Sequence, residues 1–377
     1  MATTRKTQSA ADVFASRRTR LYRQLCKDSK ATAYVVTRVA DVRYLTGFSG
    51  EGLVLLAPGD DALVPYWFFG EQAQTECGAQ PKLTVVDPTR NPFENVAKHI
   101  RGKGVRAVGV QAEELTVVRQ TALQKAIGKK TLTPMPNLQG YLRLLKTDAE
   151  VRTIRKAVRV AQTALGDMAN LGASYLVGRS ELDIAAELEC RMKQLGANGL
   201  GFPSIVAAGS NSSRCHHSPS NRKLKMGDPL LIDWGAMVGG YRSDLTRTLF
   251  MGTIPPKIAA IYPVVLEANR EAIKAVRSGI TCATLDGIAR KVIEDAGYGK
   301  EFCHGLGHGL GLDVHEQPFL GKQNKTRLKA GMLITIEPGI YFPGIGGVRI
   351  EDDVLVTPDG YKLLSTFPKD LDHVVLD

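Results

Sequence analysis

Hydrophobic and polar residues alternate in short runs through the first part of the chain. Between about residues 31 and 140, Gly and Pro residues separate β-rich segments from helical segments. The β-rich segments are 32–37, 52–58, 61–67, 83–87 and 107–110, and the helical segments are 92–102 and 117–128. Strands that alternate with helices pack as a layered sheet, so this part of the chain predicts a smaller α/β domain.

A different pattern begins at Thr147. Thr147 and Glu150 form the Ser/Thr-x-x-Glu capping box that starts many helices. Behind this box, apolar residues recur every three or four positions, as they do on one face of a helix. We therefore predict a domain boundary just before Thr147, with domains at residues 1–146 and 147–377.

The second domain is predicted to contain helices followed by a strand pair, twice over. After the first helix, further helices are expected at 180–196, about 256–276 and about 285–296. The strand pairs are 230–235 with 244–251 and 333–341 with 347–357, and the turn-prone Val238-Gly239-Gly240-Tyr241 lies within the first pair. This repetition indicates an internal duplication, and the mixture of elements predicts an α+β fold.

Length and composition indicate two globular domains without a membrane span. The chain has 377 residues, of which 44% are hydrophobic and 23% charged. It has no apolar run near the roughly 18 residues that a membrane span needs, and its N-terminus is not a secretory signal. The first 20 residues are rich in Arg and Ser, so an organelle transit peptide is an alternative to a solvated basic tail.

The six cysteines are scattered along the chain, and no two of them form a CxxC pair. Free thiols in a reducing compartment explain this pattern most simply, so we expect a cytoplasmic protein. Cys215 and Cys303 each lie beside a histidine, but neither has the recognisable surroundings of a cysteine nucleophile.

The formal charge of +11 does not by itself predict nucleic-acid binding. The basic residues lie in short isolated segments, such as SRRTR (16–20) and NRKLK (221–225), without a platform of aromatic residues. We expect these segments to be solvated surface, and we expect neither nucleic acid nor membrane as a partner. Binding of a polyanion as a secondary role is the remaining alternative.

Four acidic residues lie in segments that are otherwise apolar and strand-like. Asp233 and Asp244 lie in the first strand pair, and Glu337 and Glu351 lie in the second. A buried carboxylate is costly without a positive partner, and neighbouring carboxylates repel one another. Cations held between these acids would explain the pattern, although a single acid of this kind is more often an ion-pair partner.

Histidines cluster in the same part of the chain. Three of them, His304, His308 and His315, lie in the glycine-rich segment HGLGHGLGLDVHE. One imidazole with several carboxylates suits divalent ions such as Mn, Co, Fe or Zn. Two such ions, bridged by carboxylates about 3.5–4 Å apart, form a known hydrolytic arrangement. Each motif is weak alone, and the combination and its order carry the prediction.

The order of these motifs resembles that of the pita-bread metallopeptidases, which include methionine aminopeptidase, Xaa-Pro aminopeptidase and prolidase. The resemblance lies in D-x10-D (233–244), HG-x2-HG-x-G-x3-HE (304–316), IEPGIY (336–341) and GVRIED (347–352). The segment ADVRYLTGFSGEG (40–52) is similar to the creatinase-type N-terminal domain of the proline-directed members, which methionine aminopeptidases lack. The resemblance implies a pita-bread catalytic domain, with duplicated helices and antiparallel sheet, behind a smaller creatinase-like α/β domain.

The resemblance also implies metal ligands. The five matching residues are Asp233, Asp244, His308, Glu337 and Glu351. By resemblance, Asp244 and Glu351 bridge two ions, Asp233 completes one site, and His308 and Glu337 complete the other. Glu337 is also expected to accept a proton during catalysis.

Further residues match positions around the substrate in the family. His216 is expected near the scissile carbonyl, and motif spacing favours it over the adjacent His217. By resemblance, His315 stabilises the tetrahedral intermediate and His304 lines the pocket. Two more matching residues, expected to orient the charged ligands, are Tyr341 and Arg349.

The implied activity is metal-dependent hydrolysis of the peptide bond before proline. We expect an Xaa-Pro aminopeptidase that acts on proline-containing peptides, with a prolidase that acts on dipeptides as the alternative. The expected cofactors are two divalent ions, Mn first, with Co, Zn or Fe as alternatives. A creatinase-type hydrolase or a binding protein is disfavoured because all five ligands are present. A homodimer is expected only by analogy.

Overall fold

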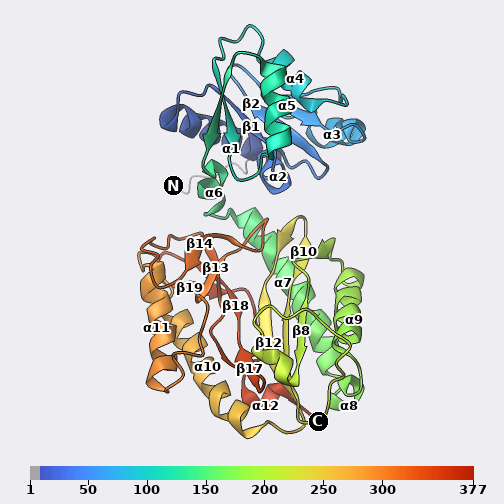
Figure 1. Ribbon diagram of the computed structural model, residues 1–377, viewed down its shortest axis with the longest axis vertical. Helices are drawn as coiled ribbons and strands as arrows, with labels where there is room; N and C mark the ends of the chain where they lie inside the picture. Colours follow the sequence, from blue (N-terminus) through green and yellow to red (C-terminus); the bar gives the residue numbers. More distant parts are fainter. Residues whose placement is uncertain (1–8) are drawn as a thin grey trace, which may run out of the picture. The chain divides into compact units, whose positions relative to one another are not determined.

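The computed structural model describes residues 9–377, so residues 1–8 of the predicted basic tail lie outside the described part. The chain divides into two compact units, Met1–Arg143 and Leu144–Asp377, and each has its own hydrophobic core (Figure 1). Among the described helices, none combines the length and the apolar composition that crossing a membrane requires.

The first unit is built on one mixed sheet with the strand order β4-β3-β2-β1-β5-β6. The strands are β1 (Ala33–Val36), β2 (Gly52–Leu56), β3 (Asp61–Pro65), β4 (Leu83–Val85), β5 (Ala107–Gln111) and β6 (Thr131–Met135). β2 is antiparallel to both β1 and β3, and the other neighbouring pairs are parallel. Each predicted β-rich segment overlaps one strand, from β1 to β5. The pattern did not reveal β6, because this edge strand has only one buried residue and contains Pro134.

Helices precede, separate and follow these strands in the sequence. They are α1 (Ala10–Asp28), α2 (Val39–Thr46), α3 (Gly70–Cys77), α4 (Pro92–His99), α5 (Val117–Ile127) and α6 (Leu138–Arg143). The two helices expected from the sequence are α4 and α5, and side-chain caps explain where each begins. Asn91 accepts from the Phe93 N–H at the start of α4, and Thr116 accepts from the Arg119 N–H at the start of α5.

Arg18 corrects the expectation that the SRRTR segment is solvated surface. Its side chain is fully buried, and its Nε donates to Asp61 Oδ2 at 3.0 Å. Its Nη1 donates to the carbonyl oxygen of Leu45 at 3.0 Å and to Gln80 Oε1 at 2.8 Å. Arg17 is also buried. These arginines anchor α1 against the unit, because a buried guanidinium is tolerated only when its donors are satisfied.

The helices of the second unit lie on two sides of its strands, with α7 and α9 on one side and α10 and α11 on the other (Figure 1). Their bounds are α7 (Asp148–Ala169), α8 (Ala173–Leu176), α9 (Glu181–Gln194), α10 (Pro256–Ala275), α11 (Cys282–Asp295) and α12 (Leu371–Val374), with a 3-10 turn at Gly209–Ser213. The predicted capping box at Thr147 and Glu150 is present, and Ser180 begins α9 in the same way with Asp183.

The strands of the second unit form two larger sheets and two small ones. They are β7 (Gly199–Leu200), β8 (Ile205–Ala208), β9 (Pro229–Trp234), β10 (Ala236–Val238), β11 (Tyr241–Arg242), β12 (Leu245–Met251), β13 (Gly307–Gly309), β14 (Glu316–Leu320), β15 (Leu333–Ile336), β16 (Gly339–Phe342), β17 (Gly346–Arg349), β18 (Asp352–Val356), β19 (Tyr361–Leu363) and β20 (Val375–Leu376). The larger sheets have the orders β20-β12-β9-β8 and β14-β13-β15-β18-β19.

Each half of the second unit contains the predicted hairpin. In the first half, β9 pairs with β12, and the tighter β10–β11 pair closes at Gly239 and Gly240 with φ values of +56° and +84°. Two consecutive positive φ angles are typical of a two-residue hairpin turn, and glycine adopts them without strain. In the second half, β15 pairs with β18 and β16 pairs with β17. The unit is therefore α+β, as expected.

Candidate metal centre and active site

The first hairpin presents two acids to one cavity. Thr246 of β12 lies opposite Asp233 of β9 in the antiparallel ladder. Asp244 directly precedes β12 and is two positions from Thr246, and side chains two positions apart lie on the same face of a strand. Both carboxylates therefore line the same cavity.

The second hairpin presents the other two acids against the first pair. Glu337 directly follows β15, and Glu351 directly precedes β18. These two strands are paired, with Ile336 opposite Asp352. The Glu351 N–H donates to the carbonyl oxygen of Thr246 at 3.1 Å, and Thr246 Oγ1 donates to Glu351 Oε2 at 2.7 Å. This bridge joins the two halves of the unit at the site of the acids.

His308 lies in β13 and turns one ring nitrogen toward these acids. Its Nδ1 hydrogen-bonds to the carbonyl oxygen of Gly309 at 3.0 Å, which places the ring proton on Nδ1. Its Nε2 lies 3.5 Å from Asp244 Oδ2 and 3.4 Å from Glu337 Oε1. Burial, with a smaller effect of His315, lowers the pKa of His308 to about 4. The neutral imidazole can therefore offer Nε2 to a metal ion.

The acids are costly in this position without cations. Burial raises the pKa of Asp244 and Glu351 well above the ordinary values, and neighbouring carboxylates raise both further. Burial also raises the pKa of Glu337 to about 8 and raises the pKa of Asp233, although the charge of Arg349 opposes both shifts. In the described part of the chain, Asp233 Oδ1 is buried and has no hydrogen-bond partner. A divalent cation would satisfy this oxygen and favour the ionised forms.

The donor set fits divalent metal ions. The ligand atoms of Asp244, His308 and Glu351 lie within 4.8 Å of one another, and all three side chains are buried. Asp233 and Glu337 line the same cavity. Carboxylate oxygens with one imidazole nitrogen suit Mn, Fe, Co or Zn. The structure thus brings together all five residues that the sequence suggested as metal ligands.

Arg349 ties one of these acids to two other predicted site residues. Its Nη2 donates to Asp233 Oδ2 at 2.7 Å, its Nε donates to Thr246 Oγ1 at 3.0 Å, and its Nη1 donates to the Tyr341 hydroxyl at 3.0 Å. The Tyr341 hydroxyl can then donate its own proton to His304 Nε2, at 2.9 Å. Burial and the charge of Arg349 lower the pKa of His304 to about 4, so the ring is a neutral acceptor.

His216 and His315 have exposed side chains and line the cavity. The ring of His315 lies edge-on to that of His308, with 4.4 Å between the ring centroids. His217 is buried instead, and its Nε2 lies 2.8 Å from Glu181 Oε2. Of the two adjacent histidines, the cavity is therefore lined by His216, as motif spacing favoured.

The cavity has a volume of about 550 Å³ and lies within the second unit. Its large apolar lining residues are Phe202, Ile205, Val314, Phe319 and Leu320. Among its described lining residues, Arg349 carries the only guanidinium or ammonium group, and that group is already bound to Asp233 and Tyr341. The cavity therefore combines an acidic floor with apolar walls.

Sequence reasoning missed three polar residues that hold this site. Thr246 bonds to Glu351, and Thr335 Oγ1 accepts the His308 N–H at 3.1 Å. Each threonine lies two positions from an acid, so the strand period could have placed it on the same face. Glu181 accepts backbone N–H hydrogen bonds from Ala208 and Ser220, at the two ends of the loop that carries His216. In the sequence it is only one of the acids in the first turn of a helix, so nothing there indicated this role.

Comparison with protein families assigns a known domain family to each of the two units. Residues 152–358 match the model of metallopeptidase family M24, and residues 17–145 match the creatinase/prolidase N-terminal domain. The chain belongs to metallopeptidase family M24, with the pita-bread fold and the creatinase-type domain that the motifs implied. Members of this family use divalent metal ions, which agrees with the donor set.

Individual relatives extend this similarity over nearly the whole chain. A putative dipeptidase of Bacillus subtilis, YkvY, is 37% identical over 354 residues, which is 92% of this chain and 96% of that protein. A solved Xaa-Pro dipeptidase from Bacillus anthracis is 33% identical, with a TM-score of 0.90, and covers 96% of this chain and 100% of its own. An X-Pro aminopeptidase from Thermotoga maritima is 28% identical, with a TM-score of 0.84, and covers 93% and 99%.

Proposed function

We propose that this protein is an Xaa-Pro dipeptidase, or prolidase, that uses two divalent metal ions to hydrolyse the bond before proline. The convergence of Asp244, His308 and Glu351 within 4.8 Å carries the metal-dependent part of the proposal. Similarity to the Bacillus anthracis dipeptidase over 96% of the chain supports the substrate. This similarity shifts the preference from the aminopeptidase expected from the sequence to its alternative.

Different residues of the cavity would bind the metal ions and take part in catalysis. The ions, with Mn as the first candidate, would be held by Asp233, Asp244, His308, Glu337 and Glu351. When bound, these ions supply Lewis-acid polarisation of the scissile carbonyl and lower the pKa of water. Arg349 keeps Asp233 in position through the 2.7 Å contact of Nη2 with Oδ2.

Proton transfer and charge stabilisation come from side chains that line the cavity. A Glu337 carboxylate oxygen accepts the proton of the attacking water and returns it to the proline nitrogen that leaves. His315 donates a hydrogen bond to the oxygen of the tetrahedral intermediate, an electrostatic effect worth about 3–4 kcal/mol in comparable sites. His216 binds the substrate near the scissile carbonyl, and the apolar walls exclude water from the proline ring.

An Xaa-Pro aminopeptidase is the second candidate, and one observation favours it. A dipeptidase must bind the free carboxylate of its substrate, but Arg349, the only guanidinium or ammonium group among the described lining residues, is already paired. In the second unit, that carboxylate would depend on imidazoles such as His216. A peptide that continues beyond proline has no such requirement.

Substrates that differ only beyond proline distinguish the two candidates. The protein is loaded with Mn²⁺, and kcat/KM is measured for Ala-Pro, Ala-Pro amide and Ala-Pro-Ala, with Ala-Ala as the control without proline. A dipeptidase hydrolyses Ala-Pro best and loses at least tenfold on the amide. Equal or faster hydrolysis of Ala-Pro-Ala would identify the aminopeptidase, and hydrolysis of Ala-Ala alone would exclude both. A cytoplasmic location and a homodimer stay predictions.

A further inference from the structure

Behind the metal centre lies a buried polar group that no catalytic role explains. Asn269, on α10, is fully buried and points toward the ends of two strands. Its Nδ2 donates two hydrogen bonds, to the carbonyl oxygen of Ile336 at 3.0 Å and to that of Ile350 at 3.2 Å. Both amide protons of one side chain are therefore used, one on the last residue of β15 and the other on the residue that follows β17.

Those two carbonyls belong to the residues directly before two predicted metal ligands. Ile336 precedes Glu337, and Ile350 precedes Glu351. A carbonyl oxygen and the next Cα atom share one planar peptide unit, so fixing the oxygen limits where the next Cα can lie. One nitrogen bound to both oxygens therefore limits the separation of the two glutamate backbones.

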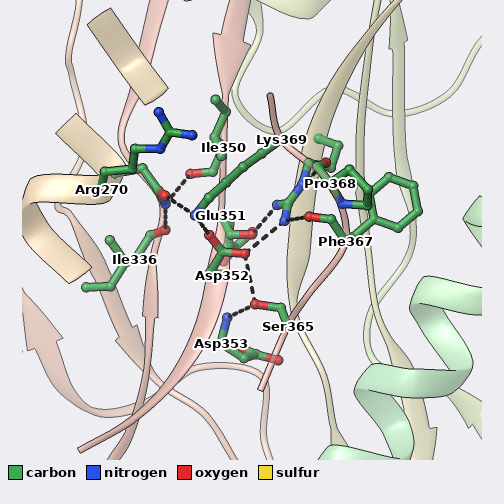
Figure 2. Close-up of polar contacts among 12 residues, drawn as sticks. Arg270, Ile336, Ile350, Glu351, Asp352, Asp353, Ser365, Phe367, Pro368 and Lys369 are labelled. Atoms are coloured by element: carbon green, nitrogen blue, oxygen red, sulfur yellow. Dashed lines mark hydrogen bonds and ion pairs between the residues drawn. The ribbon is translucent and has the colours of Figure 1, made fainter. Parts of the chain in front are cut away.

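The amide of Asn269 is itself held in a defined orientation. Lys369 Nζ donates to Asn269 Oδ1 at 2.7 Å, which identifies the oxygen side of the amide, and donates to Asp352 Oδ2 at 2.5 Å. Figure 2 shows Lys369 and Asp352 close together, beside the carbonyls of Ile336 and Ile350. The lysine thus leaves only the nitrogen side of Asn269 to face the two strands.

The same network reaches Glu351 from its other side. Arg247 is fully buried; its Nη1 donates to the Glu351 carbonyl oxygen at 2.6 Å, and its Nη2 donates to Asp352 Oδ1 at 2.9 Å. Ser365 Oγ also donates to Asp352 Oδ1, at 2.9 Å (Figure 2). The peptide units before and after Glu351 are therefore both fixed, one by Asn269 and the other by Arg247.

We infer that Asn269 is a positioning residue for the metal centre, because it sets the spacing between the backbones of Glu337 and Glu351. The same hydrogen-bond network is completed by Lys369, Asp352 and Arg247. Metal ions demand donor positions within a few tenths of an ångström, so a looser pair of strands weakens binding before it affects the fold. This inference rests on the proposed metal site and does not depend on the proposed substrate.

The test compares Mn²⁺ affinity in four metal-free proteins by isothermal titration calorimetry. Asn269→Asp keeps the shape of the side chain but presents oxygen to both carbonyls. Asn269→Ser keeps one donor and is the milder variant. Val265→Ala is the matched control, because Val265 is also fully buried on α10 but lies outside the network. Thermal unfolding of each metal-free protein measures the structural cost separately.

We expect the dissociation constant for Mn²⁺ to rise about 10–100-fold in Asn269→Asp, the range found when groups that orient metal ligands are removed. Asn269→Ser should show a smaller rise, and Val265→Ala should lose thermal stability while binding Mn²⁺ like the wild type. Wild-type affinity in Asn269→Ser and in any folded Asn269→Asp would overturn the inference. A wild-type protein that binds no Mn²⁺ at all would overturn the proposed metal site instead.

Discussion

Removing the metal should make the stability of this protein depend strongly on pH, and Glu337 should cause much of the effect. Burial raises the pKa of Glu337 from the ordinary 4.5 to about 8 in the metal-free fold. The carboxyl is therefore accommodated in its protonated form and penalised in its ionised form. The penalty is absent below the unfolded-state pKa, grows as pH rises, and levels off above the folded-state pKa.

The magnitude follows from the size of the shift. One unit of pKa shift corresponds to about 1.4 kcal/mol, so Glu337 alone should lower the free energy of unfolding by about 3 kcal/mol between pH 5 and pH 8. Glu337→Gln, which has nearly the same shape and cannot ionise, should not show this loss. The metal-free variant should therefore become more stable than the metal-free wild type as pH rises.

Urea unfolding of chelated protein at several pH values between 5 and 8 measures this difference directly. Glu267→Gln provides the matched control, because Glu267 is exposed on α10 and its replacement should leave the pH dependence unchanged. Saturating Mn²⁺ should reverse the order and stabilise the wild type by about 2.7 kcal/mol at a hundredfold excess over the dissociation constant. Parallel pH curves for the metal-free wild type and Glu337→Gln would refute the reasoning.

Four further predictions test other parts of the molecule. Asp244→Asn should bind less Mn²⁺ by elemental analysis and lose activity, and full turnover would contradict its assignment as a ligand. His315→Ala should keep its metal and lose about 100-fold or more in kcat, as after loss of one oxyanion donor, whereas loss of metal would assign it a different role. Arg18→Met should destabilise the first unit by about 1–3 kcal/mol in urea, because the Leu45 carbonyl and Gln80 Oε1 lose their donor and the partly buried Asp61 loses its ion pair, and a change below about 0.5 kcal/mol would contradict this. The sulfur atoms of Cys215 and Cys303 lie 3.7 Å apart. Hydrogen peroxide should therefore oxidise both thiols to a disulfide while it is reduced to water, and activity should fall until a thiol reductant restores it. Mass spectrometry that finds the two cysteines unlinked after this treatment would refute the prediction.

The sequence predicted the elements whose signals are local. A capping box identified the start of α7, the helix expected from Ser180 is α9, and the two glycines identified the β10–β11 turn. Boundaries were less accurate where the signal is a single residue. α11 begins at Cys282, three positions before the expected start, because Thr281 accepts from the Thr284 N–H and caps the helix there.

Features that depend on distant residues could not be predicted in the same way. Arg18 can be buried because Asp61, 43 residues away in the sequence, pairs with it. The number and spacing of charged residues in the sequence do not show which distant residue will be the partner. The cavity walls combine Phe202 with Phe319 from the other half of the unit. The five ligand positions carry no information about the rest of the cavity, and the ligand motifs alone could not separate dipeptidase from aminopeptidase.

The metal ligands and the residues that position them differ in how they can be found. Asp233 and Glu351 interrupt apolar strands, so their charge is conspicuous in the sequence. Asn269 interrupts a helix whose other buried positions are mostly apolar, and one buried amide in a helix is compatible with many roles. Its role depends on its two acceptors, the carbonyl oxygens of residues that follow it by 67 and 81 positions. A charged ligand is thus visible from its own sequence context, whereas a residue that sets the distance between ligands is visible only once the strands are placed.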